Sequence, residues 1–197
     1  MKSFKCYDKP SCIIGFQRIS SCMRYTKKEI IEQLDRQTKE LVGWYINRPI
    51  QSMENGPEGA WTAGQHLLHM IKSTKPLAVG AGYPRLLLRW KFGKVKSPSL
   101  DYHALIEKYT DALAAGGQAT GVFVPRVVRK DEREVLVNRF KSEMGILVNN
   151  LHKWSESNLD NTAVPHPLIG KLTFREMLYF TIYHIEHHLR ILNERYK

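Results

Sequence analysis

The chain has 197 residues, of which 43% are hydrophobic, and a formal net charge of +11. This length and composition are enough for one sizeable hydrophobic core, so one main domain is expected. The sequence has no run of about 18 apolar residues, which excludes a membrane-spanning helix. Its positive charge is consistent with an acidic binding partner, or with a soluble protein that is simply basic.

The cysteines all lie at the start of the chain. Cys6, Cys12 and Cys22 precede Met23, so disulfides cannot hold the main domain together and a cytoplasmic location is expected. Residues 1–22 lack the apolar run of a signal peptide. We predict that they form a loosely ordered extension ahead of a domain at 23–197, with Met23 as an alternative start of the chain.

Two helices are predicted in the first part of this domain. Thr26-Lys-Lys-Glu29 is a capping box, in which Thr and Glu side chains bind free N–H groups at a helix start, and the apolar spacing after it predicts a helix over 27–46. Thr62-Ala-Gly-Gln65 has the same pattern and predicts a helix over 63–75, which Pro76 should interrupt.

The second predicted helix carries two histidines, His66 and His69. They share a stripe with Thr62 and Ser73, whereas the most apolar residues of the helix define a different face. We interpret the histidine stripe as facing a polar site. The alternative is that both histidines face solvent.

A basic segment follows. Residues 78–100 contain no acidic residue and hold Arg85, Arg89, Lys91, Lys94 and Lys96. A short helix is predicted at 84–92, and another at 100–115 should end at Gly116-Gly117. The basic cluster suits an anionic substrate, a membrane surface or nucleic acid, and a solvated basic loop is the alternative.

Two strong helices close the chain. Asp131-Glu-Arg-Glu134 is predicted to cap a helix that reaches about residue 155, and residues 155–161 are predicted to be a polar loop. A third capping box, Thr173-Phe-Arg-Glu176, predicts a helix over 174–195. The apolar seam of the first of these helices consists of Leu136, Phe140, Met144, Leu147, Leu151 and Trp154.

The helical pattern predicts the fold class. Four long amphipathic helices without an alternating strand pattern indicate an all-α protein. We expect an antiparallel four-helix bundle with one long crossover insertion.

The last predicted helix carries the strongest chemical signal. His184 and His188 are four residues apart, so their imidazoles lie on one face about 5–6 Å apart. Apolar residues such as Met177 and Phe180 lie near the same stripe, so the pair should face the core. Buried ring nitrogens need partners, which a divalent metal or neighbouring hydrogen bonds can supply. His187 lies on the flank and is expected at the outer face.

Three motifs together resemble the DinB-like metalloproteins, which are four-helix bundles of the DinB/YfiT type. They are Trp61-Thr-x-x-Gln-x-x-x-His69, His166-Pro-Leu-Ile-Gly-Lys-Leu-Thr173 and Tyr183-His184-x-x-x-His188-Leu-Arg, within a resemblance that covers about residues 26–197. The last two are similar to a DinB-related subfamily of unknown function. The resemblance implies a divalent metal, zinc or nickel, bound by His69, His184 and His188. We expect His66, His187 and Gln65 to be neighbours of these ligands or alternative ligands.

The resemblance also implies a function. Three imidazoles leave open positions on a metal, as catalytic sites do, and such a metal can activate a bound water or thiol. Some similar proteins are transferases that use bacillithiol or mycothiol, and dimers are common among them. We therefore expect a metal-dependent thiol S-transferase or hydrolase, forming a homodimer and acting on a small anionic molecule, with Arg85 or Arg89 supplying positive charge.

A non-catalytic protein is the alternative hypothesis. The chain would then be a metal-binding stress-response or nucleic-acid-binding module. Basic residues gathered around the metal would favour a small anionic substrate, whereas a flat basic face remote from it would favour nucleic acid. We expect the small-molecule partner.

Overall fold

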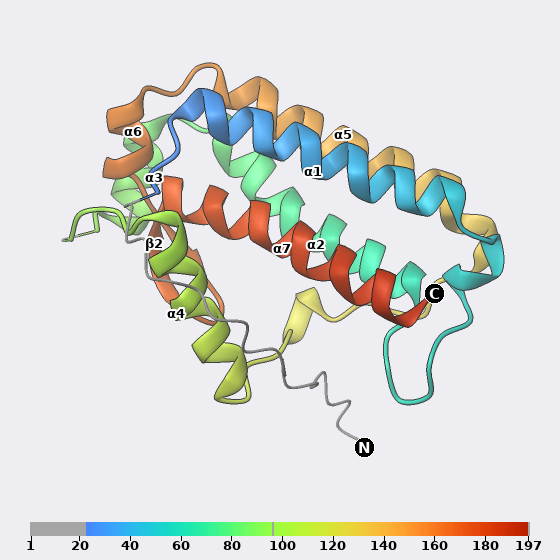
Figure 1. Ribbon diagram of the computed structural model, residues 1–197. Coiled ribbons are helices and arrows are strands. Elements are labelled where there is room, and N and C mark those ends of the chain that lie inside the picture. Colours follow the sequence, from blue (N-terminus) through green and yellow to red (C-terminus); the bar gives the residue numbers. More distant parts are fainter. Residues whose placement is uncertain (1–22, 96, 197) are drawn as a thin grey trace.

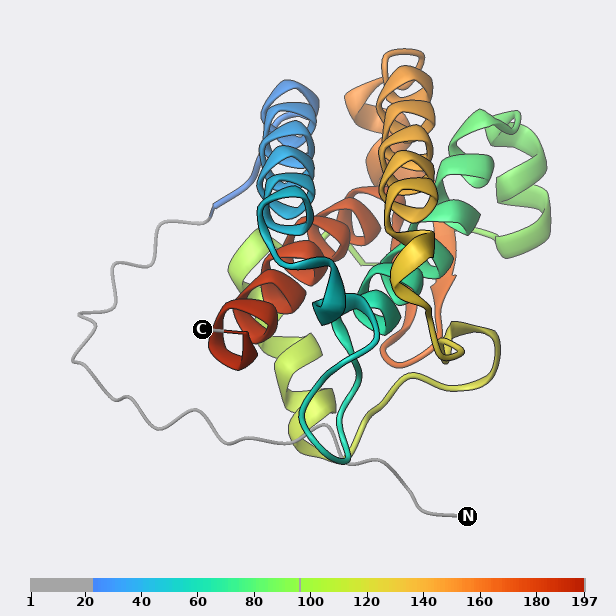
Figure 2. The same cartoon turned by 90° about the vertical axis from the view of Figure 1, so that its right-hand side faces the viewer.

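Four long helices enclose one core in the computed structural model, which describes residues 23–95 and 97–196 (Figure 1). They are α1 (Lys27–Asn47), α2 (Ala63–Gly82), α5 (Arg133–Leu151) and α7 (Phe174–Arg195). α2 packs against α5, α5 against α1, and α1 against α7, as the end-on view of Figure 2 shows. The predicted four-helix bundle is therefore confirmed. The extension predicted at residues 1–22 lies outside the described residues.

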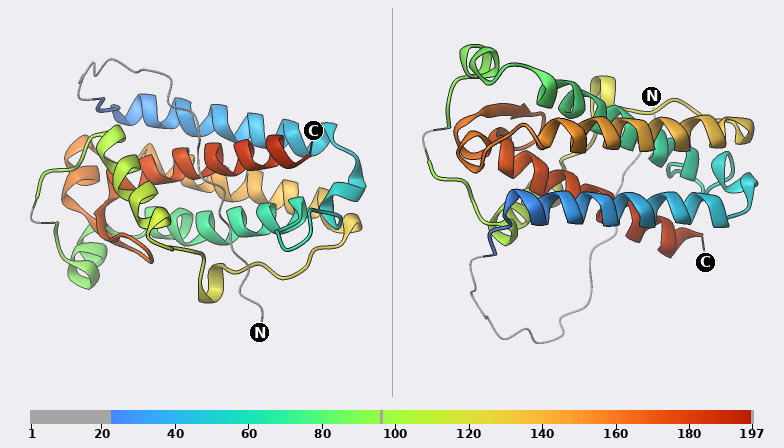
Figure 3. Two further views of the ribbon diagram at one scale, coloured as in Figure 1. Left: turned by 60° about the horizontal axis from the view of Figure 1, so that its bottom comes forward. Right: turned by 90° about the horizontal axis from the view of Figure 1, so that it is seen from above.

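The order of the helices requires a long crossover. α1 and α7 run in one direction, whereas α2 and α5 lie side by side and run in the other (Figures 1 and 3). The chain therefore returns along the bundle between α2 and α5. It does so through α3 (Arg85–Phe92), α4 (Tyr102–Ala114) and two short 3-10 helices, Gly121–Phe123 and Lys130–Glu132. A further 3-10 helix, Ile50–Met53, joins α1 to α2. None of the helices described has the length and apolar character needed to cross a bilayer.

The three predicted capping boxes begin three of the four bundle helices. Thr26, Thr62 and Thr173 each accept a hydrogen bond from the backbone N–H three residues later, and the Glu or Gln at that position binds back. The predicted cap of α5 is wrong. The Asp131 carboxylate binds the Arg129 guanidinium instead, and α5 begins at Arg133 after a turn of 3-10 helix.

α2 is longer than predicted. It continues through Pro76 to Gly82, although proline removes one helical hydrogen bond and crowds the preceding turn. Tertiary contacts hold the part beyond the proline. Ala78 and Ala81 are buried, and their carbonyl groups accept hydrogen bonds from Asn150 and from the indole of Trp154.

All six predicted seam residues are buried, but α5 ends at Leu151 rather than near residue 155, so Trp154 packs on the core from the loop that follows the helix. The polar loop predicted after it is wrong. Residues Glu156–Asn161 form a short helix, α6, which Ser155 caps by accepting from the N–H of Asn158. Leu159 is fully buried and fixes α6 on the core.

A β-hairpin that the sequence pattern did not predict precedes α7. β1 (Ala163–His166) pairs antiparallel with β2 (Gly170–Thr173), with Val164 opposite Leu172. Gly170 has a φ of 82°, which is unfavourable for residues with a side chain. Nδ1 of His166 accepts hydrogen bonds from the N–H groups of Leu168 and Ile169 and so closes the turn.

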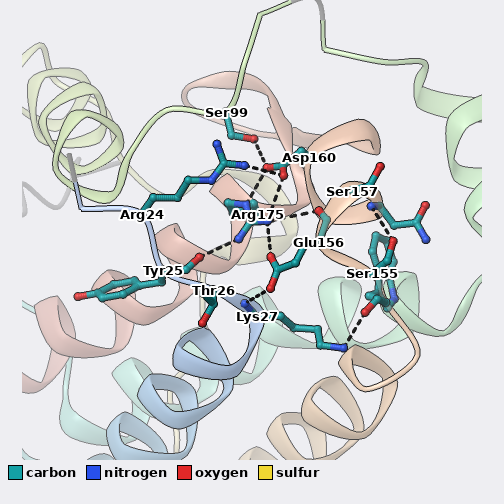
Figure 4. A network of polar contacts seen from close by, with 12 residues as sticks. Arg24, Tyr25, Thr26, Lys27, Ser99, Ser155, Glu156, Ser157, Asp160 and Arg175 are labelled. Atoms are coloured by element: carbon teal, nitrogen blue, oxygen red, sulfur yellow. Dashed lines mark hydrogen bonds and ion pairs between the residues drawn. The ribbon is translucent and has the colours of Figure 1, made fainter.

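A buried arginine ties the hairpin end of the bundle together (Figure 4). The Arg175 side chain is 2% exposed and donates to Asp160 and Glu156 of α6 and to the carbonyl of Tyr25 ahead of α1. Burial alone would raise the pKa of the Glu156 and Asp160 carboxyls, but the hydrogen bonds and charge of Arg175, together with hydrogen bonds from the Lys27 N–H to Glu156 and from Ser99 to Asp160, outweigh it and lower both pKa values. The network therefore fixes where α7 begins.

Candidate metal centre

α2 and α7 bring four buried imidazoles together. α2 carries His66 and His69, and α7 carries His184 and His188. The helical spacing of the α7 pair places their ring centroids 4.6 Å apart. Because α2 packs against α7, the His69 ring lies 5.0 Å from each of them.

Three ring nitrogens converge within this group. Nε2 of His184 lies 3.1 Å from Nε2 of His69 and 3.0 Å from Nε2 of His188. The candidate ligand atoms of the three residues all lie within 4.8 Å of one another. Nitrogens bound tetrahedrally to one zinc ion at about 2.0–2.1 Å would be about 3.3 Å apart. The observed spacing therefore fits one divalent metal.

The outer nitrogens of the rings support the same conclusion. Nδ1 of His69 lies 2.8 Å from the carbonyl oxygen of Phe123, so it carries the proton and leaves Nε2 with a free lone pair. Nδ1 of His188 lies 2.8 Å from Nδ1 of His66. When Nε2 of His188 keeps its lone pair free, the proton of the His188 ring is on Nδ1, which then donates to His66. Such outer hydrogen bonds orient imidazole ligands of metals. The lone pairs on Nε2 of His69 and of His188 both lie about 3 Å from Nε2 of His184, which can donate a proton to only one of them. A metal ion that accepts a lone pair from each of the three rings suits this arrangement.

Burial keeps these imidazoles uncharged. It lowers the pKa of His69, and lowers those of His184 and His188 well below the ordinary value. It also lowers the pKa of His66 to about 3. Metals bind the neutral form of imidazole, so the cluster needs no deprotonation near pH 7.

None of the other three residues predicted to lie near the metal belongs to the group of converging ligands among the described residues. His66 contacts His188 through Nδ1 and so lies directly behind a candidate ligand, whereas its buried Nε2 has no hydrogen-bond partner within the described ranges. Gln65 accepts from the backbone N–H of Thr62 and serves as part of the helix cap. His187 is half-buried, stacks on Tyr183 and lies outside the group of three converging nitrogens.

The three-histidine cluster borders a large cavity of about 1210 Å³. His69 and His184 line it, whereas His188 is not among the lining residues. Its other walls come from α3, α4, the hairpin, α7 and residues 116–123. Binding pockets for small molecules typically measure about 300–1,000 Å³, so this cavity has room for a substrate next to the cluster.

The two arginines predicted to bind an anion face elsewhere. Arg85 donates to the carbonyl of Lys153 and lies over the Trp154 ring, and Arg89 donates to Asn158. Neither is among the residues that line the cavity, whereas Lys91 is. An anion-binding role for Arg85 and Arg89 stays a prediction.

Two groups at the site were not assigned a role from the sequence. One is the carbonyl of Phe123, which belongs to a segment without clear periodicity and binds His69. The other is His166, which lines the cavity. The motif around His166 drew attention to it, but its place at the cavity depends on the unpredicted hairpin.

The comparisons with known proteins agree with this architecture. Residues 24–192 match the model of the DinB superfamily. The crystal structure of TT2238, described as a four-helix bundle protein, superimposes with a TM-score of 0.51 at 19% identity, over 86% of this chain and 99% of that one. YfiT from Bacillus subtilis, described as a probable metal-dependent hydrolase with an unusual four-helix bundle topology, gives a TM-score of 0.56 at 14% identity over 92% of both chains. None of the curated proteins matches the chain. Because the family match spans most of its length, this protein belongs to the DinB superfamily.

Proposed function

We propose that this protein is a metal-dependent hydrolase that holds one divalent ion through His69, His184 and His188. The observation that carries the proposal is the convergence of three uncharged ring nitrogens beside a large cavity. Structural zinc sites normally have four protein ligands, whereas catalytic sites have three and keep an open position. The group found among the described residues has three members, and the nearby His66 uses Nδ1 to bind His188.

The metal and the chain would have separate tasks. When bound, the metal would act as a Lewis acid toward a substrate carbonyl and would lower the pKa of water. His66 and the Phe123 carbonyl hold the rings of His188 and His69 in place, and the cavity walls limit the access of solvent. Imidazole ligands suit both zinc and nickel, and we favour zinc because three imidazoles with one open position are typical of catalytic zinc. A cytoplasmic location and a homodimer stay predictions.

Thiol transfer at the same centre is the second candidate. Lys91 lines the cavity, and it is the one charged side chain among the described lining residues apart from the titratable histidines. Its ammonium group would suit the acidic part of a low-molecular-weight thiol of the bacillithiol kind. The predicted nucleic-acid module has less support, because Arg85 and Arg89 are engaged with the α5–α6 end of the bundle.

Turnover of chromogenic p-nitrophenyl esters by zinc-loaded protein tests the proposal, with and without added thiol. We expect thiol-independent hydrolysis that a chelator abolishes and added zinc restores. His184→Ala should lower kcat/KM by at least about 100-fold, since loss of a ligand removes the metal. The exposed His152→Ala is the matched control and should retain activity. Hydrolysis that survives in metal-free His184→Ala protein would contradict the proposal, and turnover that requires thiol would favour the second candidate.

A further inference from the structure

The walls of the cavity beside the histidines are mainly apolar. Aliphatic and aromatic side chains reach it from α2, α3, α4, the hairpin turn and α7, and no carboxylate is among the described lining residues. Six representative members of this lining are Leu77, Leu88, Phe92, Leu113, Leu168 and Met177.

We infer that the substrate is an elongated apolar molecule with a single polar acceptor group, such as a fatty acyl compound, whose chain fills this cavity. The binding of the apolar chain stands on the lining of the cavity alone. The reaction at the acceptor group rests on the proposed metal-dependent hydrolase function. The small anionic substrate expected from the sequence fits the site less well, because the two arginines assigned to it lie elsewhere.

The size of the cavity supports a large apolar ligand. Its volume of about 1210 Å³ exceeds the usual upper range of about 1,000 Å³ for small-molecule pockets. Burial of apolar surface strengthens binding with each added methylene. A small polar molecule would leave most of these walls without contact, whereas a long chain would cover them.

The rim of the cavity is apolar as well. Trp90 and Leu87 of α3 both line the cavity, yet they are 81% and 43% exposed. Next to them on the same helix, Leu86 is 80% exposed. An apolar molecule would therefore meet apolar side chains at the rim before it reaches the interior.

His166 can hold the polar end of such a molecule. Its Nδ1 accepts two backbone hydrogen bonds, at 3.1 Å from Leu168 and 3.2 Å from Ile169, so the proton of the neutral ring lies on Nε2. Burial lowers the pKa of His166 to about 4, which keeps the ring neutral near pH 7. The Phe180 ring packs against both His166 and His184, with centroids 4.3 Å and 4.8 Å away, and both histidines line the cavity. A carbonyl or carboxylate oxygen bound by His166 would thus lie on the side of the cavity that carries the metal-binding histidines.

Gly80 allows the cavity to be narrowed without strain. It lies on α2, lines the cavity and has no atom within 4 Å of the position a Cβ would take. A leucine there would fill part of the cavity and would also favour the helix. Gly145 on α5 offers the matched control, because it is exposed, equally free of neighbours and outside the cavity lining.

Isothermal titration calorimetry with dodecanoate, butanoate and succinate tests the inference on both metal-free and zinc-loaded protein. We expect dodecanoate to bind at one site per chain, at least about 100-fold more tightly than butanoate, because the longer chain buries more methylenes. Succinate should bind weakly or not at all. Gly80→Leu should weaken dodecanoate binding at least about tenfold and leave zinc binding unchanged, whereas Gly145→Leu should bind both as the unmodified chain does.

The possible outcomes separate this inference from the proposed function. Three results would overturn the inference. They are equal affinities for dodecanoate and butanoate, a higher affinity for succinate than for dodecanoate, and an affinity for dodecanoate that Gly80→Leu leaves unchanged. Dodecanoate binding to a protein that binds no zinc would support the apolar site and contradict the metal-dependent function.

His166→Asn tests the placement of the polar end. The Asn carbonyl oxygen can replace Nδ1 as the acceptor of the turn, but the variant lacks the Nε2–H donor. We expect dodecanoate affinity to fall about tenfold with little change in the melting temperature. Unchanged affinity in a folded variant would show that His166 does not hold the acceptor group.

Discussion

Acidification of the metal-free protein from about pH 7.5 to about pH 5 is expected to destabilise it severely. Burial lowers the pKa of His66 to about 3 and lowers those of His184 and His188 well below 6.5. The unfolded chain therefore takes up protons below about pH 6.5 while the folded chain does not, so stability is lost as the pH falls. At pH 5 the loss from His66 alone is about 2 kcal/mol, and His184 and His188 add to it in the same direction, against a typical total stability of about 5–15 kcal/mol.

Chemical denaturation followed by circular dichroism at a series of pH values measures this effect. Zinc should move the acid transition to lower pH, because it binds the folded protein in preference to the unfolded chain. His66→Gln removes one titrating ring and keeps an acceptor for His188, so it should flatten the pH dependence. The exposed His103→Gln is the control and should not change it. A stability that stays constant between pH 7.5 and 5 would contradict the burial of neutral histidines.

Replacement of Arg175 by Met is expected to cause the largest loss of stability at neutral pH. The guanidinium is 2% exposed and bonded to Asp160, Glu156 and the carbonyl of Tyr25. Removal of one partner from a buried ion pair typically costs about 3–5 kcal/mol, and we expect the lower end of this range because the Glu156 and Asp160 side chains are 54% and 22% exposed. For a chain of this size the melting temperature should fall by about 10 °C.

Arg126→Met is the matched control for Arg175→Met. Its guanidinium pairs with Glu132 at the surface and is 60% exposed, so its removal should change stability by no more than about 1 kcal/mol. Thermal unfolding of both variants at the same pH makes the comparison. Equal effects of the two substitutions would show that the network in Figure 4 does not secure this end of the bundle.

The features of the fold that depend on local sequence were predictable. The capping boxes at Thr26, Thr62 and Thr173 involve side chains and N–H groups only three residues apart, so spacing alone identifies them. Features that depend on distant contacts were not. Pro76 stays inside α2 because Asn150 and Trp154 bind the turns beyond it, and neither residue is near Pro76 in the sequence.

The candidate site shows the same division. The pairing of His184 with His188 follows from helical spacing, and the structure places them together. His69 could be chosen over His66 only through the family motif, because the orientation of α2 relative to α7 decides which ring faces the pair. The role of His166 at the cavity depends on a hairpin with four-residue strands, too short to give a clear alternating pattern.

Zinc K-edge X-ray absorption spectroscopy of protein loaded with one equivalent of zinc tests the central claim most directly. We expect scattering from three imidazole nitrogens at about 2.0–2.1 Å, with the rest of the coordination supplied from outside the chain. Single substitutions of His69, His184 and His188 should each remove this signal, whereas His66→Gln should retain it. Coordination by four protein ligands, or an unchanged spectrum when any one of the three histidines is replaced, would contradict an open three-histidine metal centre.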